Sequence, residues 1–354
     1  MSIRIEIPEL NKAVKQDTLK YIDTLTKPPG SLGKLEELAA EIAAMTAKPF
    51  PIVTPPGVLI FAGDHGIVEE GVSAFPQEVT AQMVQNFLTG GAAISVFSRQ
   101  IGAKLEIVDV GVAAEIASHA DLHVEKVGFG TRNFLKEDAM TGSEAEAAIA
   151  IGMNRAFVMI DHGVKCLIVG EMGIGNTTPS TAILASLSDA PIDKIVGAGT
   201  GLSNDAIAVK ARVIAEAISK RQPDRHDPLD VLSKVGGFEI AAMAGAMMAA
   251  ASRRVPVLVD GFISTVAALV ATRLEPNSND YMIVGHASAE RGHETAVKML
   301  NKTPLLQLGF RLGEGSGAAV AFPIVQAATL MLNEMATFET AGIAEKTVRK
   351  EEVR

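Results

Sequence analysis

The chain has 354 residues, a length that allows one large domain with an appendage or two domains. Hydrophobic residues make up 48% of it and charged residues 21%, which is typical of a globular protein and excludes a disordered chain. The net charge of -9, the absence of Trp and the lack of a dominant Lys/Arg run argue against nucleic acid as a partner.

The sequence predicts a cytoplasmic protein without a membrane span. Its one cysteine, Cys166, cannot form a disulfide within the chain, and residues 1–7 lack the apolar stretch of a signal peptide. The two most apolar segments, Ile240–Ala251 and Val255–Ala271, are separated by polar residues, and Asp260 interrupts the second. Because a spanning helix needs about 20 uninterrupted apolar residues, we interpret both segments as buried core or as part of a subunit interface.

Helical and strand patterns alternate along the chain. A helix is predicted over Leu32–Ala47, where apolar residues recur at helical spacing. Short β-branched runs follow, most of them preceding an alanine-rich helical stretch, and each run ends in glycine and a polar residue. The runs cover residues 58–62, 105–108, 166–169, 195–196, 255–259, 282–284 and 305–308, and a last helical segment follows Ala318. This alternation predicts an α/β fold, with helices on both faces of a parallel sheet.

The predicted elements suggest two parts and one site. We expect a large α/β domain over residues 50–320, and a smaller helical subdomain built from residues 1–49 and 321–354. Ligands of parallel sheets bind beyond the carboxyl ends of the strands, where glycines and polar residues collect in this sequence. Turn chemistry would account for any one of these turns, but their repetition, with acids and histidines at the same relative place, favours a shared site.

A first candidate site is the glycine-rich segment Gly170–Ser180, which follows a predicted strand and opens a helix near Pro179. Glycines and hydroxyls at a helix N-terminus present N–H donors to an anion, and the helix dipole adds to the attraction. The segment lacks the spacing of a nucleoside triphosphate loop. An ordinary turn between strand and helix is the alternative.

A second candidate is Val196–Leu202, which precedes the predicted helix Asn204–Lys220. It resembles half of a dinucleotide fingerprint, but its third glycine is misplaced. On the helix, Lys210 shares a face with Ile207 and Ile214. It could therefore reach a phosphate at the glycine-rich turns, or extend to solvent instead.

The third candidate is Glu314, which lies between two glycines just after an apolar run. Partial shielding there can raise the pKa of a carboxyl group toward the range useful for a general base. The alternative is a helix-start glutamate favoured by the helix dipole. Glu171 is a second strand-end carboxylate, and two carboxylates can divide acid and base work.

Several histidines invite a metal interpretation. His286, Glu290 and His293 are spaced to share one face of a helix, but His-Glu-x-x-His is absent and Gly292 weakens the helix. We therefore expect no metal, and the roles of these histidines and of His65 stay open.

The motifs together resemble the nicotinate-nucleotide–dimethylbenzimidazole phosphoribosyltransferases of cobalamin lower-ligand assembly. The resemblance extends from about Lys27 to Val325. It rests on the segments 27–33, 61–66, 71–76, 79–83, 170–178, 236–239, 259–262, 285–288 and 311–317.

The resemblance implies a Rossmann-like, mostly parallel sheet with a small subdomain from both termini, in a homodimer that needs no cofactor or metal. It implies that Glu314 is the catalytic base and that Glu171 is a second carboxylate near the site that binds the benzimidazole; whether Glu171 and Glu314 face each other stays open. The phosphate and ribose would be bound by Gly173, Gly175, Asn176, Thr177, Thr178, Gly201 and Lys210. The wall of the base pocket would be Phe75, Gln82, Met172, Ile174 and Leu312, where Phe75 replaces a tyrosine of some members.

The implied reaction transfers the phosphoribosyl group of nicotinate mononucleotide to 5,6-dimethylbenzimidazole or a related base. Two other classes of protein are compatible with a parallel sheet and this pocket. A dinucleotide-dependent oxidoreductase would need a better-placed Gly-x-Gly-x-x-Gly motif. A non-catalytic nucleotide sensor would bind ligand without releasing nicotinate.

Overall fold

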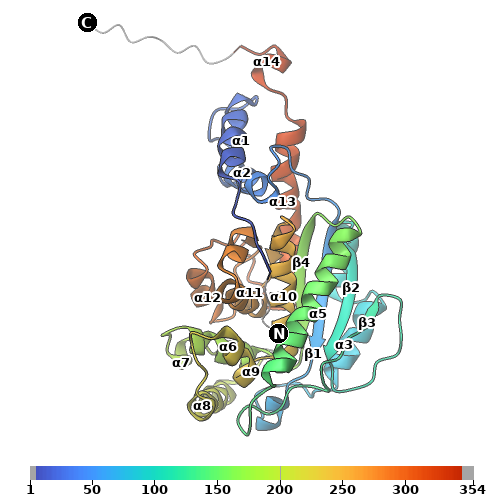
Figure 1. The fold of residues 1–354 in the computed structure, drawn as a ribbon, viewed down its shortest axis with the longest axis vertical. Coiled ribbons are helices and arrows are strands. Elements are labelled where there is room, and N and C mark those ends of the chain that lie inside the picture. Colours follow the sequence, from blue (N-terminus) through green and yellow to red (C-terminus); the bar gives the residue numbers. More distant parts are fainter. Residues whose placement is uncertain (1–4, 200, 345–354) are drawn as a thin grey trace, which may run out of the picture. The chain divides into compact units, whose positions relative to one another are not determined.

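The computed structural model describes residues 5–199 and 201–344 (Figure 1). The sequence predictions that concern residues 1–4, Thr200 and residues 345–354 lie outside the described part.

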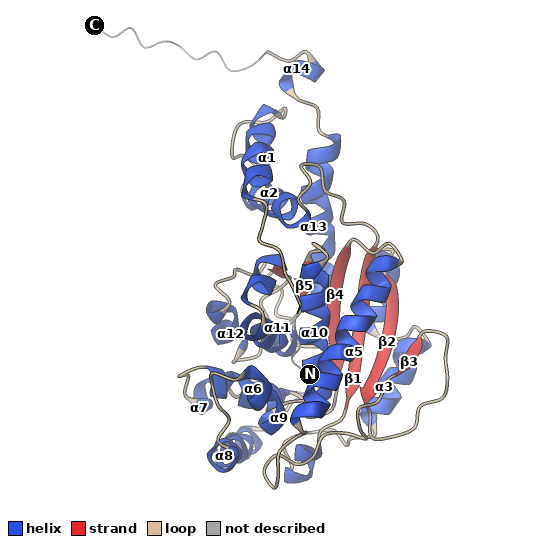
Figure 2. Cartoon of the chain, viewed as in Figure 1, coloured by secondary structure: helices blue, strands red, loops and turns tan. Residues whose placement is uncertain are grey.

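The large part of the chain is built on a six-stranded, all-parallel sheet (Figure 2). The strands are β1 Pro56–Gly63, β2 Lys104–Gly111, β3 Leu122–Val124, β4 Cys166–Met172, β5 Val257–Val259 and β6 Met282–Val284. All eight residues of β1 are buried, as expected for a strand with helices on both faces. The structure confirms the predicted α/β fold with a parallel sheet.

Helices make up most of the remaining described chain. They are α1 Lys12–Thr24, α2 Lys34–Thr46, α3 Val79–Leu88, α4 Ala93–Gln100, α5 Gly142–Asp161, α6 Thr177–Leu187, α7 Ile192–Ile195, α8 Asn204–Arg221, α9 Pro228–Val235, α10 Phe238–Ser252, α11 Phe262–Leu274, α12 His293–Met299, α13 Ser316–Glu334 and α14 Phe338–Ala341. The 3-10 helices are η1 Gly66–Glu70 and η2 Pro276–Tyr281. A capping box of Thr141 and Glu144 begins α5, which lies with α10 across one face of the sheet (Figure 2).

The strand order β3-β2-β1-β4-β5-β6 decides where a ligand can bind. The chain builds the sheet outward from β1 through β2 to β3, and then returns to the other side of β1 with β4. Loops leaving β1 and β4 therefore diverge, and the crevice between them is the usual ligand site of such sheets.

Two predicted strands are wrong. Residues 195–196 end the short helix α7 and cap it, since Ile195 is its last residue. Residues 305–308 form only an isolated bridge between His286 and Leu306. Both runs are apolar, but neither finds the continuous backbone partner that defines a strand. Conversely, β3 pairs with β2 although its three residues carry little pattern of their own.

The chain divides into two compact units. One contains Thr54–Phe322 together with the N-terminal segment that ends at Glu9, and the other contains Leu10–Val53 and the chain from Pro323 onward. The segment before Leu10, which the sequence suggested for the smaller part, groups with the larger unit because Asn277 and Tyr281 donate hydrogen bonds to the Ile7 and Pro8 carbonyl groups.

Two helices bear on the question of a membrane span. Helix α10 corresponds to the apolar segment around residues 240–251, and Phe238–Ala251 are all buried, as expected for core. Helix α13 is, by length and composition alone, apolar enough to cross a membrane, but 61% of its most apolar window is buried within the protein. That burial is the pattern of a core helix.

Candidate active site

A cavity of about 350 Å³ lies beyond the carboxyl ends of β4, β5 and β6, within the larger unit. Its volume is in the range of small-molecule sites. The described residues that line it are Phe75, Val79, Met83, Glu171, Met172, Gly173, Ile174, Asn176, Thr177, Gly199, Asp260, Gly261, Phe262, Ile263, Ser264, His286, Ser288, Glu290, Arg311, Leu312, Gly313 and Glu314.

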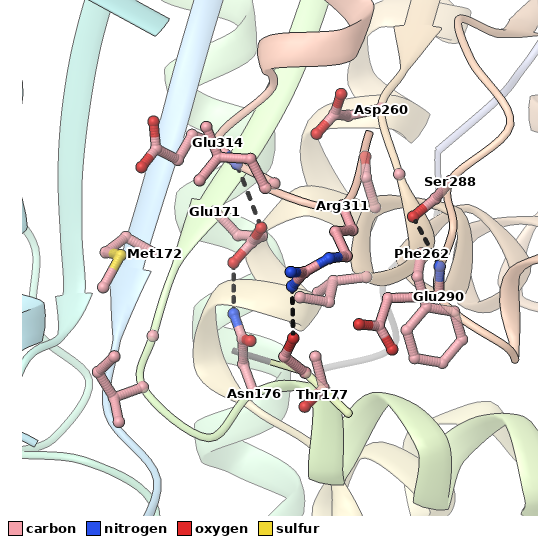
Figure 3. A pocket seen from close by; sticks show the side chains of 18 of the residues that line it. Glu171, Met172, Asn176, Thr177, Asp260, Phe262, Ser288, Glu290, Arg311 and Glu314 are labelled. Carbon is pink, nitrogen blue, oxygen red and sulfur yellow. Dashed lines mark hydrogen bonds between the residues drawn. The ribbon is translucent and has the colours of Figure 1, made fainter. Parts of the chain in front are cut away.

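Glu171 lies near the end of β4, in the middle of this cavity (Figure 3). Its Oε2 accepts a hydrogen bond from the Asn176 side chain, and its Oε1 accepts one from the backbone N–H of Glu314 at 3.3 Å. Burial raises the pKa of Glu171 to about 8, although these hydrogen bonds act in the opposite direction. The sequence left open whether Glu171 and Glu314 face each other. In the structure the Glu171 carboxyl group is hydrogen-bonded to the backbone N–H of Glu314.

Glu314 is held in a left-handed turn. Its φ is 65°, and the flanking Gly313 and Gly315 have φ of 87° and 80°. A non-glycine residue in this region costs about 1–3 kcal/mol, and such strain is typical of functional sites. Burial raises the pKa of Glu314 to about 7, and the negative charge of Asp260 adds to the shift, while a hydrogen bond from the Ile94 backbone opposes it. The Oε2 atom of Glu314 has no hydrogen-bond partner among the described residues, so it can accept a proton from a ligand.

The cavity is lined by both apolar and polar side chains (Figure 3). Glu314 and Met172 lie on one side of the view, and Arg311, Glu290, Ser288 and the ring of Phe262 lie on the other. The lining also includes the apolar side chains Phe75, Val79, Met83, Ile174 and Leu312. Such a site suits a ligand pair of which one member is a flat apolar ring and the other is charged.

A smaller cavity adjoins the main one, at the N-terminus of α6. It is lined by Val72, Ser73, Gly173, Gly175, Asn176, Thr177, Ala198, Gly199, Leu202 and Lys210. Lys210 is fully buried, and its Nζ donates a hydrogen bond to Thr177 Oγ1 at 2.6 Å. Burial lowers the pKa of Lys210 to about 8, and nearby Glu290 acts in the opposite direction. A buried cation beside a helix N-terminus is a strong site for a phosphate.

The structure brings most of the predicted site residues together. Glu171, Glu314, Phe75, Met172, Ile174, Leu312, Gly173, Asn176 and Thr177 line the main cavity, and Gly175 and Lys210 line the adjoining one. Three others lie outside both linings. Thr178 is buried within α6, and Gly201 is exposed in the loop before α8. Gln82 is also exposed, on α3 between the lining residues Val79 and Met83.

The histidines have protein partners. His65 Nε2 lies 3.0 Å from Glu239 Oε1 in a fully buried pair, and His286 Nε2 lies 3.2 Å from Asp260 Oδ1. His293 Nε2 contacts the His286 carbonyl oxygen at 3.1 Å. Within residues 5–199 and 201–344, no group of three or more His, Cys, Asp or Glu side chains is arranged to hold a metal ion.

Sequence reasoning did not assign to the cavity five of its polar residues, namely Asp260, Ser264, Ser288, Glu290 and Arg311. Asp260 directly follows β5 and Ser288 follows β6, so their strand-end positions were the available signal. No local pattern marks Arg311, which donates from Nη1 to the Gly199 carbonyl oxygen at 3.4 Å.

Comparisons with known proteins agree with this geometry. A family model described as phosphoribosyltransferase matches residues 7–343. The nicotinate-nucleotide–dimethylbenzimidazole phosphoribosyltransferase of Chloroflexus aurantiacus is 50% identical over 324 residues, 92% of each chain. That of Halalkalibacterium halodurans is 49% identical over 338 residues, 96% of this chain and 94% of the relative. The crystal structure of CobT from Thermus thermophilus has a TM-score of 0.91 and 41% identity, and covers 94% of this chain and 100% of its own. The chain belongs to the nicotinate-nucleotide–dimethylbenzimidazole phosphoribosyltransferase family.

Proposed function

We propose that the protein transfers the phosphoribosyl group of nicotinate mononucleotide to 5,6-dimethylbenzimidazole or a related base. The products are nicotinate and α-ribazole 5′-phosphate, the nucleotide of the cobalamin lower ligand. The observation that carries the proposal is a cavity lined by apolar side chains and by the buried Glu314 carboxyl group, with a buried lysine in the smaller cavity that adjoins it. The named relatives support the same reaction.

We propose a place in the cavity for each part of the substrates. The phosphate is placed at the N-terminus of α6, beside Lys210 and Thr177. The benzimidazole lies between the apolar side chains, within reach of Glu314. Nicotinate carries a carboxylate into a cavity already lined by acidic side chains, and Arg311 is the cation available to it in that lining.

The chemistry then follows from the substrates. The ring nitrogen of nicotinate mononucleotide is a pyridinium, so nicotinate leaves with the electron pair of the C1′–N bond and needs no proton. Oxocarbenium character develops at C1′ as this bond breaks. One benzimidazole nitrogen attacks C1′ from the opposite face, which turns the β-nucleotide into an α-riboside, and Glu314 takes the N–H proton of the other nitrogen. Holding the two partners in line supplies much of the rate enhancement.

The proposal is tested by mixing purified protein with nicotinate mononucleotide and dimethylbenzimidazole and following nicotinate by chromatography. We expect release that depends on the added base, with an α-riboside phosphate as the co-product. Glu314→Gln is expected to lose most turnover while still binding nicotinate mononucleotide. Absence of release with any benzimidazole or purine from folded protein would contradict the proposal, and undiminished turnover in Glu314→Gln would remove the proposed base.

One observation favours a second candidate, an oxidoreductase, because the strand order is also that of dinucleotide-binding sheets. In a dinucleotide-binding sheet the phosphate site follows β1. Here the turn after β1 leads into the 3-10 helix η1, and the small cavity lined by Lys210 and Thr177 follows β4 instead. Thermal protection by NAD, with none by nicotinate mononucleotide, would support the oxidoreductase. Tight binding of nicotinate mononucleotide without release of nicotinate would support a sensor.

We also propose that the protein is a cytoplasmic homodimer. Apolar side chains at the cavity remain exposed in the single chain, Phe75 by 47% and Leu312 by 59%, and a second subunit would cover such a surface. The single cysteine, Cys166, is buried and free, as suits a reducing compartment. Light scattering after gel filtration should give twice the chain mass of 37.1 kDa. A mass of one chain would contradict the dimer.

A further inference from the structure

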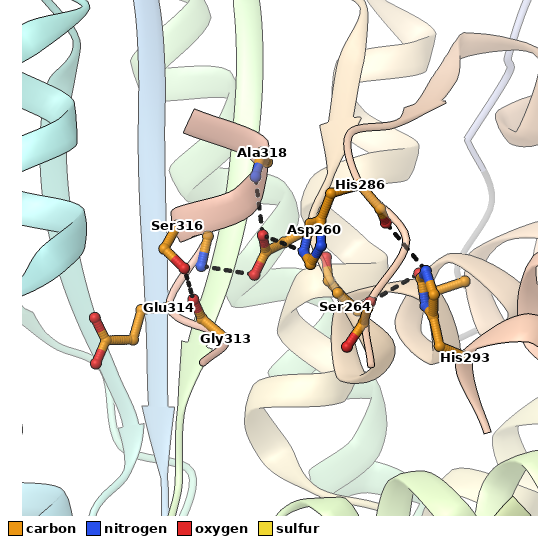
Figure 4. Close-up of polar contacts among 12 residues, drawn as sticks. Asp260, Ser264, His286, His293, Gly313, Glu314, Ser316 and Ala318 are labelled. Carbon is orange, nitrogen blue, oxygen red and sulfur yellow. Dashed lines mark hydrogen bonds and ion pairs between the residues drawn. The ribbon is translucent and has the colours of Figure 1, made fainter. Parts of the chain in front are cut away.

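Asp260 directly follows β5, is almost fully buried and faces the turn that carries Glu314 (Figure 4). Its Oδ2 accepts a hydrogen bond from the Gly315 N–H at 3.1 Å, and its Oδ1 accepts one from the Ala318 N–H at 2.9 Å. Oδ1 also lies 3.2 Å from His286 Nε2. Asp260 therefore binds the N-terminal end of α13, whose first turn begins two residues after Glu314.

The turn at Glu314 needs such external support. Three successive residues have left-handed φ, which L-residues other than glycine adopt only at a cost. Two carboxylates bind neighbouring N–H groups of this turn from different strands. Glu171 on β4 accepts from Glu314, and Asp260 after β5 accepts from Gly315. Asp260 places a negative charge beside this turn, so its bonds to backbone N–H groups are charge-assisted and stronger than bonds to a neutral acceptor.

His286 restrains Asp260 in turn. The His286 side chain is buried and packs closely against Gly317 of α13, where an added Cβ would overlap the ring. Its backbone carbonyl oxygen is in contact with His293, which also lies 3.4 Å from Thr265 Oγ1. Asp260 is thus fixed between the α13 N-terminus on one side and a packed imidazole on the other (Figure 4).

We propose that Asp260 is a positioning residue for the phosphoribosyl transfer, because it holds the Gly315 and Ala318 N–H groups and thereby aims the Glu314 carboxylate at the base. The inference rests on the proposed function for its effect on turnover. Its effect on the turn itself does not depend on that function. Asp260 also places a negative charge near Glu314, so it favours the proton-accepting role that Glu314 has in the reaction.

The first test is Asp260→Asn, which keeps the shape of the side chain but removes its charge and directs an amide N–H₂ toward a backbone N–H. We expect kcat to fall about 100-fold, as for small displacements of a reacting group, while KM for nicotinate mononucleotide stays within about threefold. The acid limb of the kcat profile should move to lower pH, because the Asp260 charge no longer raises the pKa of Glu314. The substitution leaves the other charged and titratable residues that line the cavity in place, among them Glu171, His286 and Arg311.

The second measurement asks whether Asp260 acts through Glu314. In a Glu314→Gln background, Asp260→Asn should cost little further turnover, since the group that it positions is already lost. The matched control is Asp109→Asn. Asp109 is also a buried strand-end carboxylate that accepts two backbone N–H groups, from Gly111 and Val112, but it does not line the cavity. Its replacement should lower stability without moving the pH limb.

Amide hydrogen exchange at Gly315 and Ala318 is the readout that needs no activity. Amide exchange at both residues should become faster in Asp260→Asn. If the wild type had no transferase activity, the proposed function would be contradicted, but this exchange measurement would still test whether Asp260 holds the turn. If Asp260→Asn does not fold, His286→Ala and His286→Gln replace it, and the Gln variant should retain more turnover because its amide can still donate to Asp260. The proposal would be overturned by any of three results. The first is unchanged amide exchange at Gly315 and Ala318 together with an acid limb that stays at the wild-type pH. The second is an equal loss of turnover from Asp260→Asn in the wild-type and Glu314→Gln backgrounds, and the third is wild-type turnover in His286→Ala.

Discussion

Replacing Lys210 with Met should stabilise the protein and weaken substrate binding. Lys210 is fully buried on α8, and burial lowers its pKa from 10.5 to about 8. Each tenfold change in a protonation equilibrium corresponds to about 1.4 kcal/mol, so keeping this ammonium charged in the folded protein costs roughly 3 kcal/mol. Because the folded pKa is the lower one, the cost is carried in full below about pH 8 and disappears above the unfolded value of 10.5.

Methionine has a similar length and no charge, so the variant avoids this cost but loses the hydrogen bond to Thr177, worth about 1 kcal/mol. The free energy of unfolding at pH 7 should therefore rise by about 2 kcal/mol; this gain should vanish near about pH 10, and above it the variant should be slightly less stable because only the lost hydrogen bond remains. We expect the phosphate of nicotinate mononucleotide to supply a counter-charge to Lys210 in addition to that of nearby Glu290. Its affinity should fall about 30- to 100-fold in the variant, the loss of one charge-assisted contact of about 2–3 kcal/mol.

Denaturant unfolding at pH 7 and at the highest pH that the fold tolerates measures the first effect, and titration calorimetry with nicotinate mononucleotide measures the second. Lys210→Arg is the control that keeps a charge and should not be stabilised. A Met variant that is less stable than the wild type at pH 7 would refute the burial argument. Unchanged affinity for nicotinate mononucleotide would refute the phosphate assignment.

Three further predictions concern residues that line the cavity. The kcat profile should rise about tenfold per pH unit up to about pH 7 and then level off, since Glu314 must be ionised to accept a proton and burial raises its pKa to about 7; a profile flat from pH 5 to 8 would contradict this. Arg311→Gln should lower kcat/KM for nicotinate mononucleotide at least 30-fold but that for nicotinamide mononucleotide by no more than about threefold, and equal losses for both would remove Arg311 as the carboxylate partner. Phe75→Ala should raise KM for dimethylbenzimidazole about tenfold with KM for nicotinate mononucleotide unchanged, which initial-rate kinetics with each substrate varied in turn can check.

Local pattern was enough for the fold class and for most strands. Five of the six strands were predicted, because buried parallel strands are continuous apolar runs that end in glycine and polar residues. Residues 195–196 and 305–308 share that pattern and are not strands, since a strand exists only where a neighbouring backbone completes its hydrogen bonds. For the same reason β3 could not be predicted from its own three residues.

The candidate site divides in the same way. The sequence was enough to select Glu171, Glu314 and the glycine-rich segment before α6 as candidates. Each of them lies in a short continuous motif in which the glycines and the polar residues are neighbours in the chain. The sequence left open whether Lys210 reaches a phosphate at the glycine-rich turns or extends to solvent, and only the fold buries it beside Thr177.

Arg311 carried no local signal for its place in the cavity, and Asp260 carried only its position at the end of a strand. Asp260 meets the Glu314 turn because β5 lies next to β4 in the sheet, although 88 residues separate Asp260 from Met172, the last residue of β4. The sequence by itself thus determined which segments end in reactive groups. The order of the strands decided which of those ends meet, because hydrogen bonding between strands joins segments that are distant along the chain.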